Sequence, residues 1–305
     1  DGKVRTSFWQ ILNTGRVSSG SKRDNKPNMQ NIPANNAFRN CFHAREGYTI
    51  VSVDYSGQEL RIIADGSKDP VWLKCIEEGQ DLHSVCAELV YGTEWITSGK
   101  EECAFYGKNK QKCDCPGHKK LRTNVKTINF GLAYGMSKFK LSDTLKISIE
   151  EAEKLITKYF KAFPRIKKFL EYLGEYGVNN GHIKTFAPFR RIRFFEEWRP
   201  GIKKDRDSFK IKGAIERASK NTPIQGTGAD MIKLAMVLIR EYIKEHDFPA
   251  YVVTQVHDEI GVEVREDKAE EWSAIQSGIM EAAGEHIIKS LPMEVEGTIS
   301  KEWCK

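Results

Sequence analysis

The sequence lacks long apolar runs. No hydrophobic stretch approaches the roughly 20 residues that a membrane-spanning helix needs, and none reads as a secretory signal. Internal repeats, low-complexity tracts and obvious linkers are also missing. The 305 residues can bury a sizeable core and could form two lobes. We therefore expect a soluble globular protein.

The chain has no regular cysteine framework: its seven cysteines are unevenly spaced. An odd number without a secretory segment argues against a disulfide framework and favours a reducing compartment. Four potential soft ligands fall between residues 103 and 118, namely Cys103, Cys113, Cys115 and His118. Their spacing matches no standard zinc finger, so a closed zinc site and free thiols in a loop are equally favoured.

Positive charge exceeds negative charge, giving a net charge of +6. The cations cluster, notably in residues 108–126 and at Arg190, Arg191 and Arg193. Such clusters suit a polyanion such as nucleic acid, although lysine-rich solvated helix faces are common.

Two carboxylates stand at the ends of predicted strands. The β-branched stretch 48–53 reads as a buried strand and runs into Asp54, which a helix follows. Asp258 lies in the turn between predicted strands 251–256 and 260–264. Considered by itself, the position of Asp54 favours a helix cap over a metal ligand. If the two strands are neighbours, both carboxylates can hold a pair of magnesium ions for phosphoryl transfer.

Residues 121–135 form a helical pattern in which Arg122, Lys126, Phe130 and Tyr134 recur every four residues. Two cations followed by two aromatic rings suit a ligand with phosphates at one end and a flat base at the other. The alternative is an amphipathic helix with both rings in the core.

Capping signals predict further helices, beginning after Asp69, after Asp81 and at the Ser148 capping box. A helix over residues 216–244 is expected to break at Thr222–Pro223.

Six stretches together resemble one family. In chain order they are NTGRVSS, PNMQNIP, VDYSGQELR, RTNVKTINFGLAYG, NTPIQGTGADMIKLAM and QVHDEIGVEV. The chain is similar to the polymerase domain of family A DNA polymerases, the group of bacterial DNA polymerase I and many phage replicative polymerases.

The resemblance implies an α+β right-hand fold: an antiparallel palm sheet with helices, and helical fingers. Residues 1–65 and 196–305 would form the palm. Residues 66–195 would form the fingers, with a Cys/His insertion over 95–118. The thumb and exonuclease domains of the family have no counterpart here, so a separate segment or processivity factor is an expected partner.

The resemblance also implies roles for individual residues. Asp54 and Asp258, with the carbonyl of Tyr55, would bind magnesium, and Glu259 would be a secondary acidic residue of the catalytic set. Glu59 would exclude a ribose 2′-hydroxyl. Arg122, Lys126 and His83 would contact the triphosphate, with Lys126 also a catalytic acid. Phe130 would lie beside the incoming nucleotide and Tyr134 at the templating position. The expected DNA contacts are Arg16, Asn28, Gln30, Asn31, Arg217, Asn221, Gln225 and His257.

The implied reaction adds deoxynucleotides to a primer on a DNA template, in the cytoplasm of a bacterial or phage-infected cell or in an organelle. Gly57–Gln58 departs from the Gln–Ile that usually precedes the gate glutamate. Alternatives are a polymerase with reverse transcriptase activity and a catalytically silent nucleic-acid-binding module; the intact acidic and basic residues argue against the latter.

Replacing Glu59 by alanine should raise ribonucleotide incorporation, because a carboxylate at this position clashes with a 2′-hydroxyl. Primer extension with matched deoxy- and ribonucleotides measures the sugar preference. An unaltered preference would contradict the gate role.

Overall fold

The computed structural model describes residues 2–20, 26–33, 35–107, 110–197 and 206–304. The chain divides into two compact units. Unit 1 comprises residues 1–58, 186–190 and 225–305, and unit 2 comprises residues 59–185 and 191–224. The palm and fingers boundaries expected near residues 65 and 195 stay a prediction, because compactness assigns no role to either unit.

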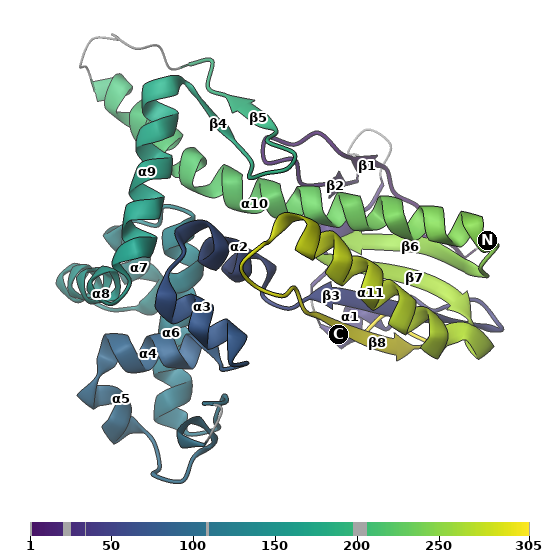
Figure 1. Cartoon of the computed structure of the whole chain (residues 1–305), viewed down its shortest axis with the longest axis horizontal. Helices are drawn as coiled ribbons and strands as arrows, with labels where there is room; N and C mark the ends of the chain where they lie inside the picture. The colour runs from purple at the N-terminus through teal and green to yellow at the C-terminus, as the bar shows by residue number, and fades with distance from the viewer. Residues whose placement is uncertain (1, 21–25, 34, 108–109, 198–205, 305) are drawn as a thin grey trace. The chain divides into compact units, whose positions relative to one another are not determined.

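Unit 1 is built on a four-stranded sheet with strand order β6-β7-β3-β8 (Figure 1). The neighbouring strands are antiparallel, and their bounds are β3 Tyr48–Tyr55, β6 Ala250–Val256, β7 Glu259–Arg265 and β8 Val295–Ser300. The predicted strands are thus confirmed. β3 is the central partner of β7 and β8, and its residues Val51 and Val53 are fully buried.

The two faces of this sheet carry different elements. Alternation along β3 turns Val51, Val53 and Tyr55 to one side, where α11 (Ala269–Ile287) packs on β3 and β8 (Figure 1). On the other side Ile50 joins a core cluster with Met29, Val256 and Trp303. The remaining elements of unit 1 are β1 Phe8–Trp9, β2 Ser18–Ser19, η1 Met29–Asn31, α1 Asn36–Arg39 and η3 Glu266–Lys268.

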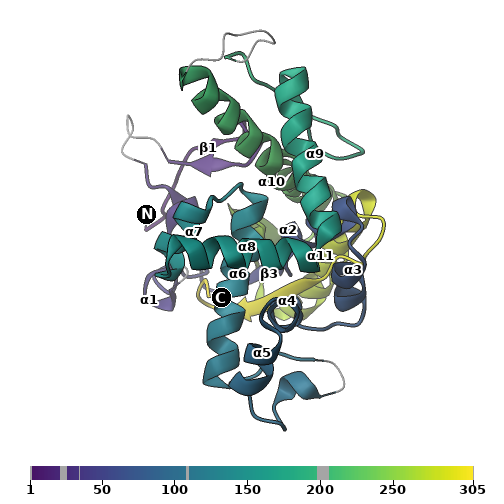
Figure 2. The same ribbon diagram turned by 90° about the vertical axis from the view of Figure 1, so that its left-hand side faces the viewer.

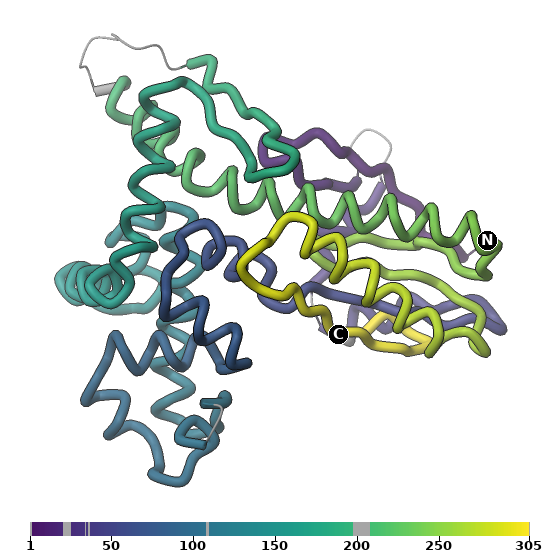
Figure 3. The backbone as a smooth tube through the Cα atoms, viewed as in Figure 1, coloured from purple at the N-terminus to yellow at the C-terminus, as the bar shows by residue number. Residues whose placement is uncertain are grey.

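The longest helix, α10 (Arg206–Glu245), contributes its residues up to Ile224 to unit 2 and the rest to unit 1. The predicted break at Thr222–Pro223 is wrong, because α10 continues through Pro223 and its backbone runs as one coil (Figure 3). A proline costs an interior helix about 3 kcal/mol. Here Thr222 and Ile224 are completely buried, so their packing outweighs that local cost.

Unit 2 is mainly helical (Figure 2). Its core includes the fully buried rings of Trp72, Trp95, Phe105, Tyr159 and Phe163. Helix α2 (Gln58–Ser67) belongs to unit 2 except for its first residue. The other elements of unit 2 are α3 Pro70–Glu77, α4 Leu82–Tyr91, α5 Thr93–Ser98, η2 Ala104–Tyr106, α6 Pro116–Ala133, α7 Lys138–Leu145, α8 Ile149–Ala162, α9 Pro164–Asn180, β4 His182–Lys184 and β5 Ile192–Phe194.

The predicted caps are confirmed: Asp69, Asp81 and Ser148 each accept hydrogen bonds from the first turn of their helix. Helix α6 differs from its expected range, since it begins at Pro116 and ends before Tyr134. Among the described residues, no helix is both long and apolar enough to cross a membrane.

Gly57 joins β3 to α2 with φ at +62°, a backbone conformation that strains any side chain. Gly57→Ala should lower the free energy of unfolding by about 1–2 kcal/mol. The matched control is Gly278→Ala in α11, where an added Cβ meets nothing within 4 Å. That change should raise stability by about 0.5–1 kcal/mol. Urea denaturation measures both, and the same sign for the two variants would contradict the assignment.

Candidate active site

The pairing of β3 with β7 brings the two predicted metal ligands onto adjacent strands. Asp54 lies opposite Glu259 in the register. The backbone N–H of Tyr55 donates to the carbonyl of Asp258 at 3.3 Å. Both aspartates are half-buried. The condition that their strands be neighbours is therefore met.

Glu259 is buried and its charge is matched inside the protein. Arg39 Nη1 lies 3.0 Å from Glu259 Oε2, and Trp303 Nε1 donates to Oε1 at 2.6 Å. The Arg39 guanidinium also lies 4.2 Å from the centroid of the Trp303 ring. Glu259 is only 3 % exposed, so its carboxylate is held by protein partners, and its secondary role in the catalytic set stays a prediction. The packing of Trp303, distant in sequence, supplies one of these partners.

The side chain of Tyr55 faces away from the carboxylates, since its hydroxyl donates to the carbonyl of Met280 at 2.6 Å. Burial, together with the negative charge of Glu281, raises the pKa of this phenol far above its usual range. Only the backbone carbonyl of Tyr55 is therefore suited to a metal.

Two glutamines hold the turn that carries Asp258. Gln30 Oε1 accepts from the backbone N–H of His257 at 3.1 Å, and Gln255 Nε2 donates to the carbonyl of His257 at 2.7 Å. Gln30 Nε2 in turn donates to the backbone carbonyl of Gln255. These bonds secure His257 in the left-handed conformation, with φ at +55°.

The side-chain amide of Gln30 thus hydrogen-bonds to the backbone of the protein itself, and the residue is only 6 % exposed. The DNA contact expected of Gln30 stays a prediction. Gln255 was not predicted to matter. Its place two residues before the turn, inside the stretch QVHDEIGVEV, is the signal that could have found it.

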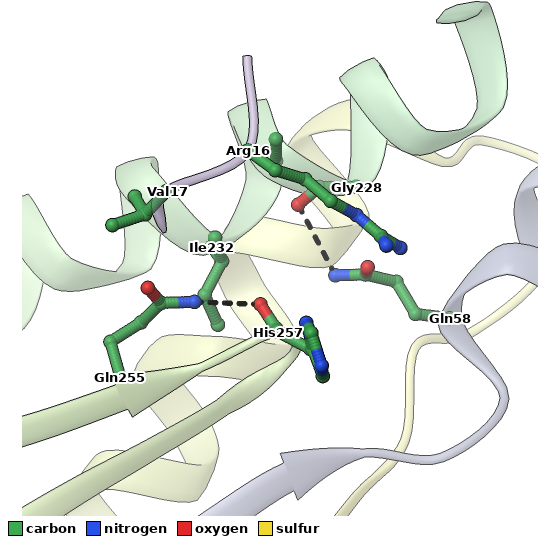
Figure 4. A pocket seen from close by; sticks show the side chains of 8 residues that line it. Arg16, Val17, Gln58, Gly228, Ile232, Gln255 and His257 are labelled. Carbon is green, nitrogen blue, oxygen red and sulfur yellow. Dashed lines mark hydrogen bonds between the residues drawn. The ribbon is translucent and has the colours of Figure 1, made fainter. Parts of the chain in front are cut away.

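A small cavity of about 10 Å³ lies beside this turn (Figure 4). Arg16, Gln58, Gly228 and His257 line it, and Gln58 Nε2 donates to the carbonyl of Gly228 at 3.4 Å. The volume suffices for about one water molecule. Gln58 is the polar residue that departs from the Gln–Ile pattern noted in the sequence. Its hydrogen bond to Gly228 packs it against α10.

The cationic helix α6 belongs to unit 2. Arg122 makes a two-pronged ion pair with Asp81, with both N–O distances at 2.7 Å. Burial opposes ionisation of Asp81, but hydrogen bonds from Arg122 and Ser84 outweigh it and lower the pKa of this carboxyl. Lys126 is exposed, and no ion pair involves it among the residues that the structure describes.

His83 is buried against the same helix. Its Nδ1 lies 2.9 Å from Asn129 Nδ2, and its ring centroid lies 5.8 Å from that of Phe130. Burial, with the nearby positive charges of Arg122 and Lys126, lowers the pKa of His83 to about 4. His83 is therefore neutral at pH 7 and only 8 % exposed, and the phosphate contact expected of it stays a prediction.

At the other end of α6 the hydroxyl of Tyr134 donates to Glu59 Oε2. Gly135, with φ at +70°, follows, and an added Cβ would lie 2.7 Å from Arg217 Cγ. A pocket of about 370 Å³ lies here, lined by Gly131, Tyr134, Gly135, Met136, Ser137, Lys140 and Arg217. The predicted gate residue and the predicted template residue are therefore in direct contact.

The remaining predicted DNA contacts lie on two elements. Asn28 caps η1 by accepting from the N–H of Gln30 at 3.1 Å, and Asn31 is exposed at the end of η1. Arg217, Asn221 and Gln225 recur every four residues along α10, of which Arg217 is exposed.

The four soft ligands predicted from the sequence do converge. One ligand atom from each of Cys103, Cys113, Cys115 and His118 lies within 4.8 Å of all the others. The described cysteines are all free thiols.

Comparisons with known proteins agree with one another. The family model for DNA polymerase family A matches residues 1–305. Thermostable DNA polymerase I of Thermus filiformis is 34 % identical over 309 residues, covering 100 % of this chain and 33 % of that protein. DNA polymerase I of Aquifex aeolicus is 35 % identical over 323 residues, covering 100 % of this chain and 47 % of that protein.

Among solved structures, the POL domain of Pol1 from M. smegmatis, in complex with DNA primer-template and dNTP, is similar with a TM-score of 0.82. It is 32 % identical, and the match covers 99 % of this chain and 48 % of that chain. This chain therefore spans about a third to a half of the length of these proteins.

His83 should make stability depend on pH. Below pH 6.5 the unfolded chain protonates this histidine, whereas the folded protein does so only near pH 4. Acidification from pH 6.5 to 4 should therefore cost the wild type up to about 3 kcal/mol more than His83→Gln. Urea denaturation of both proteins across this pH range measures the difference, and parallel profiles would contradict the buried neutral state.

Proposed function

Because the chain belongs to DNA polymerase family A, we propose that it catalyses DNA-templated extension of a primer 3′ end with deoxynucleotides. The observation that carries the proposal is the β3–β7 pairing, which brings Asp54 and Asp258 together at the strand ends. Primer–template DNA and deoxynucleoside triphosphates are the partners that follow from this activity.

The donor set at the strand ends fits magnesium. Asp54 and Asp258 offer carboxylate oxygens and Tyr55 offers a backbone carbonyl, and hard oxygen ligands of this kind suit a small divalent cation. Bound ions would activate the primer 3′-hydroxyl and neutralise charge on the phosphates. Glu259 is a positioning residue in this proposal, since its pairing with Arg39 and Trp303 anchors β7 beside Asp54.

Gln30 and Gln255 are likewise positioning residues. By holding both backbone polar groups of His257 they set the turn from which Asp258 projects. Arg16, Asn28, Asn31, Arg217, Asn221, Gln225 and His257 remain the proposed DNA contacts.

The helix α6 supplies the nucleotide site. Exposed Lys126 would contact the triphosphate and donate a proton to departing pyrophosphate. Arg122 would exchange its ion pair with Asp81 for a phosphate, which offers the same two-pronged geometry. Neutral His83 would support the ring of Phe130 through their contact, with ring centroids 5.8 Å apart, rather than add charge.

The sugar gate is positioned by a hydrogen bond. The hydroxyl of Tyr134 holds the carboxylate of Glu59, so the gate is set by the end of the nucleotide-binding helix. The pocket beside Tyr134, with Arg217 and Lys140 on its rim, suits a nucleotide of the template. A zinc ion at the Cys/His cluster would take no part in the chemistry, because four protein ligands leave no open position.

Primer extension on DNA and RNA templates tests the proposal. Asp54→Asn and Asp258→Asn should each lower the rate by about a hundredfold or more, which corresponds to about 2.7 kcal/mol of barrier. The control is Glu263→Gln, which removes a carboxylate farther along β7 that pairs with Arg45 and should leave the rate near that of the wild type.

Wild-type rates in Asp258→Asn would contradict the role of the paired aspartates. Equal extension on RNA would indicate reverse transcriptase activity. Binding of primer–template without incorporation of any nucleotide would overturn the proposal in favour of a silent binding module.

A further inference from the structure

Four soft ligands gather at the N-terminal end of α6. Cys103 follows α5, Cys113 and Cys115 precede α6, and His118 lies in its first turn. We propose that these residues bind one Zn²⁺ ion that fixes the start of α6, and that loss of this ion weakens nucleotide binding.

The distances are close to those of a tetrahedral site. With Zn–S about 2.3 Å and Zn–N about 2.0–2.1 Å, ligand atoms lie about 3.5–3.8 Å apart. His118 Nδ1 lies 3.1 Å from Cys113 Sγ and 3.6 Å from Cys103 Sγ. The four ligand atoms lie within 4.8 Å of one another, so small side-chain rotations complete the site.

The imidazole is already oriented for a metal. His118 Nε2 lies 2.9 Å from the carbonyl oxygen of Trp95, so an Nε2–H donor leaves the lone pair of Nδ1 facing the sulfur atoms. The ring also stacks on Trp95, with centroids 3.8 Å apart. An outer hydrogen bond to a carbonyl is the usual support of a metal-bound histidine.

Two glycines let the surrounding backbone close over the ligands. An added Cβ at Gly99 would lie 2.1 Å from the His118 ring, and one at Gly117 would lie 2.3 Å from the carbonyl oxygen of Ser98. His118 is 1 % exposed, and Cys113 and Cys115 are 6 % and 7 % exposed. Such closure is typical of a structural site without an open position.

Zinc is favoured over other occupants by the ligand chemistry. Three thiolates and one imidazole form a soft set that suits tetrahedral zinc, whereas magnesium requires oxygen. Without a metal, one thiol–imidazole hydrogen bond explains one sulfur beside Nδ1. The other contacts are then hydrogen bonds of Cys113 with Cys103 and Cys115, which are weak between thiols, whereas one zinc ion would bind all four ligand atoms.

The position of the site on α6 gives it a consequence for the nucleotide. His118 precedes Arg122 by one turn and Lys126 by two, or about 6 and 12 Å along the helix axis. Cys115 is the N-cap of α6 and makes no side-chain capping hydrogen bond. The metal would therefore anchor the beginning of the helix that presents both cations. This consequence rests on the proposed function.

Metal content tests the site without any substrate. The full chain, purified without chelators, should contain about one zinc per molecule by mass spectrometry. Cys113→Ser and the less buried Cys103→Ser should each lose most of it. The matched control is Cys41→Ser, an exposed cysteine outside the cluster, which should keep the zinc. Zinc near zero in the wild type even after zinc addition, or equal loss in the control, would overturn the site.

Hydrogen exchange and kinetics test the consequence. In zinc-depleted protein resupplied with magnesium, amides of residues 95–98 and 117–122 should exchange about tenfold faster or more, while those of α11 stay unchanged. The KM for deoxynucleotide should rise severalfold with a smaller change in kcat.

Unchanged exchange in α6 together with an unchanged KM would overturn the anchoring role. The zinc and exchange measurements use no substrate. A zinc-bound protein without polymerase activity therefore contradicts the proposed function alone, and an active protein that never binds zinc contradicts the metal site alone.

Discussion

The antiparallel pairing of β3 with β7 is the constraint on which the candidate site depends. Its register sets Asp54 opposite Glu259, with Asp258 at the adjoining turn. Side chains alternate along a strand, so a slip of one residue would turn Asp54 toward the face covered by α11 and Tyr55 toward the opposite face of the sheet. The fully buried residues Val51, Val53, Ile260 and Val262 oppose such a slip, because it would expose them. Hydrophobic burial thus determines the position of the carboxylates.

The Glu259 carboxylate and the backbone of His257, both beside this pairing, have hydrogen-bond partners inside the protein. Glu259 has Arg39 and Trp303 as partners, and the two glutamines satisfy the backbone of His257. A buried ion pair contributes little net stability, but loss of one partner leaves an uncompensated charge that costs about 3–5 kcal/mol. These groups therefore favour one geometry of the turn, as the proposed pair of metal-binding carboxylates would require.

In unit 2, helix α6 is the element on which the candidate site depends, as the β3–β7 pairing is in unit 1. Its C-terminal end is linked to α2 through the contact of Tyr134 with Glu59, and its middle to the start of α4 through Arg122 and Asp81. Its N-terminal end meets the four soft ligands. The same helix therefore carries the two cations proposed to bind phosphates and the two rings proposed to lie beside the nucleotide, and it contacts the proposed sugar gate, so a shift of either end would affect all three.

The sequence by itself determined the strands of the sheet, the caps at Asp69, Asp81 and Ser148, and the family, because local hydrogen bonds and alternating burial leave their pattern in nearby residues. It also singled out Cys103, Cys113, Cys115 and His118 as a group. Only the tertiary structure decided that Glu259, Gln30 and His83 are buried, that Gln255 supports the turn, and that α10 continues through Pro223. Each of these depends on partners far away in the chain, such as Trp303 for Glu259 or His257 for Gln30. Burial by distant residues outweighs local preference, and no local pattern records it.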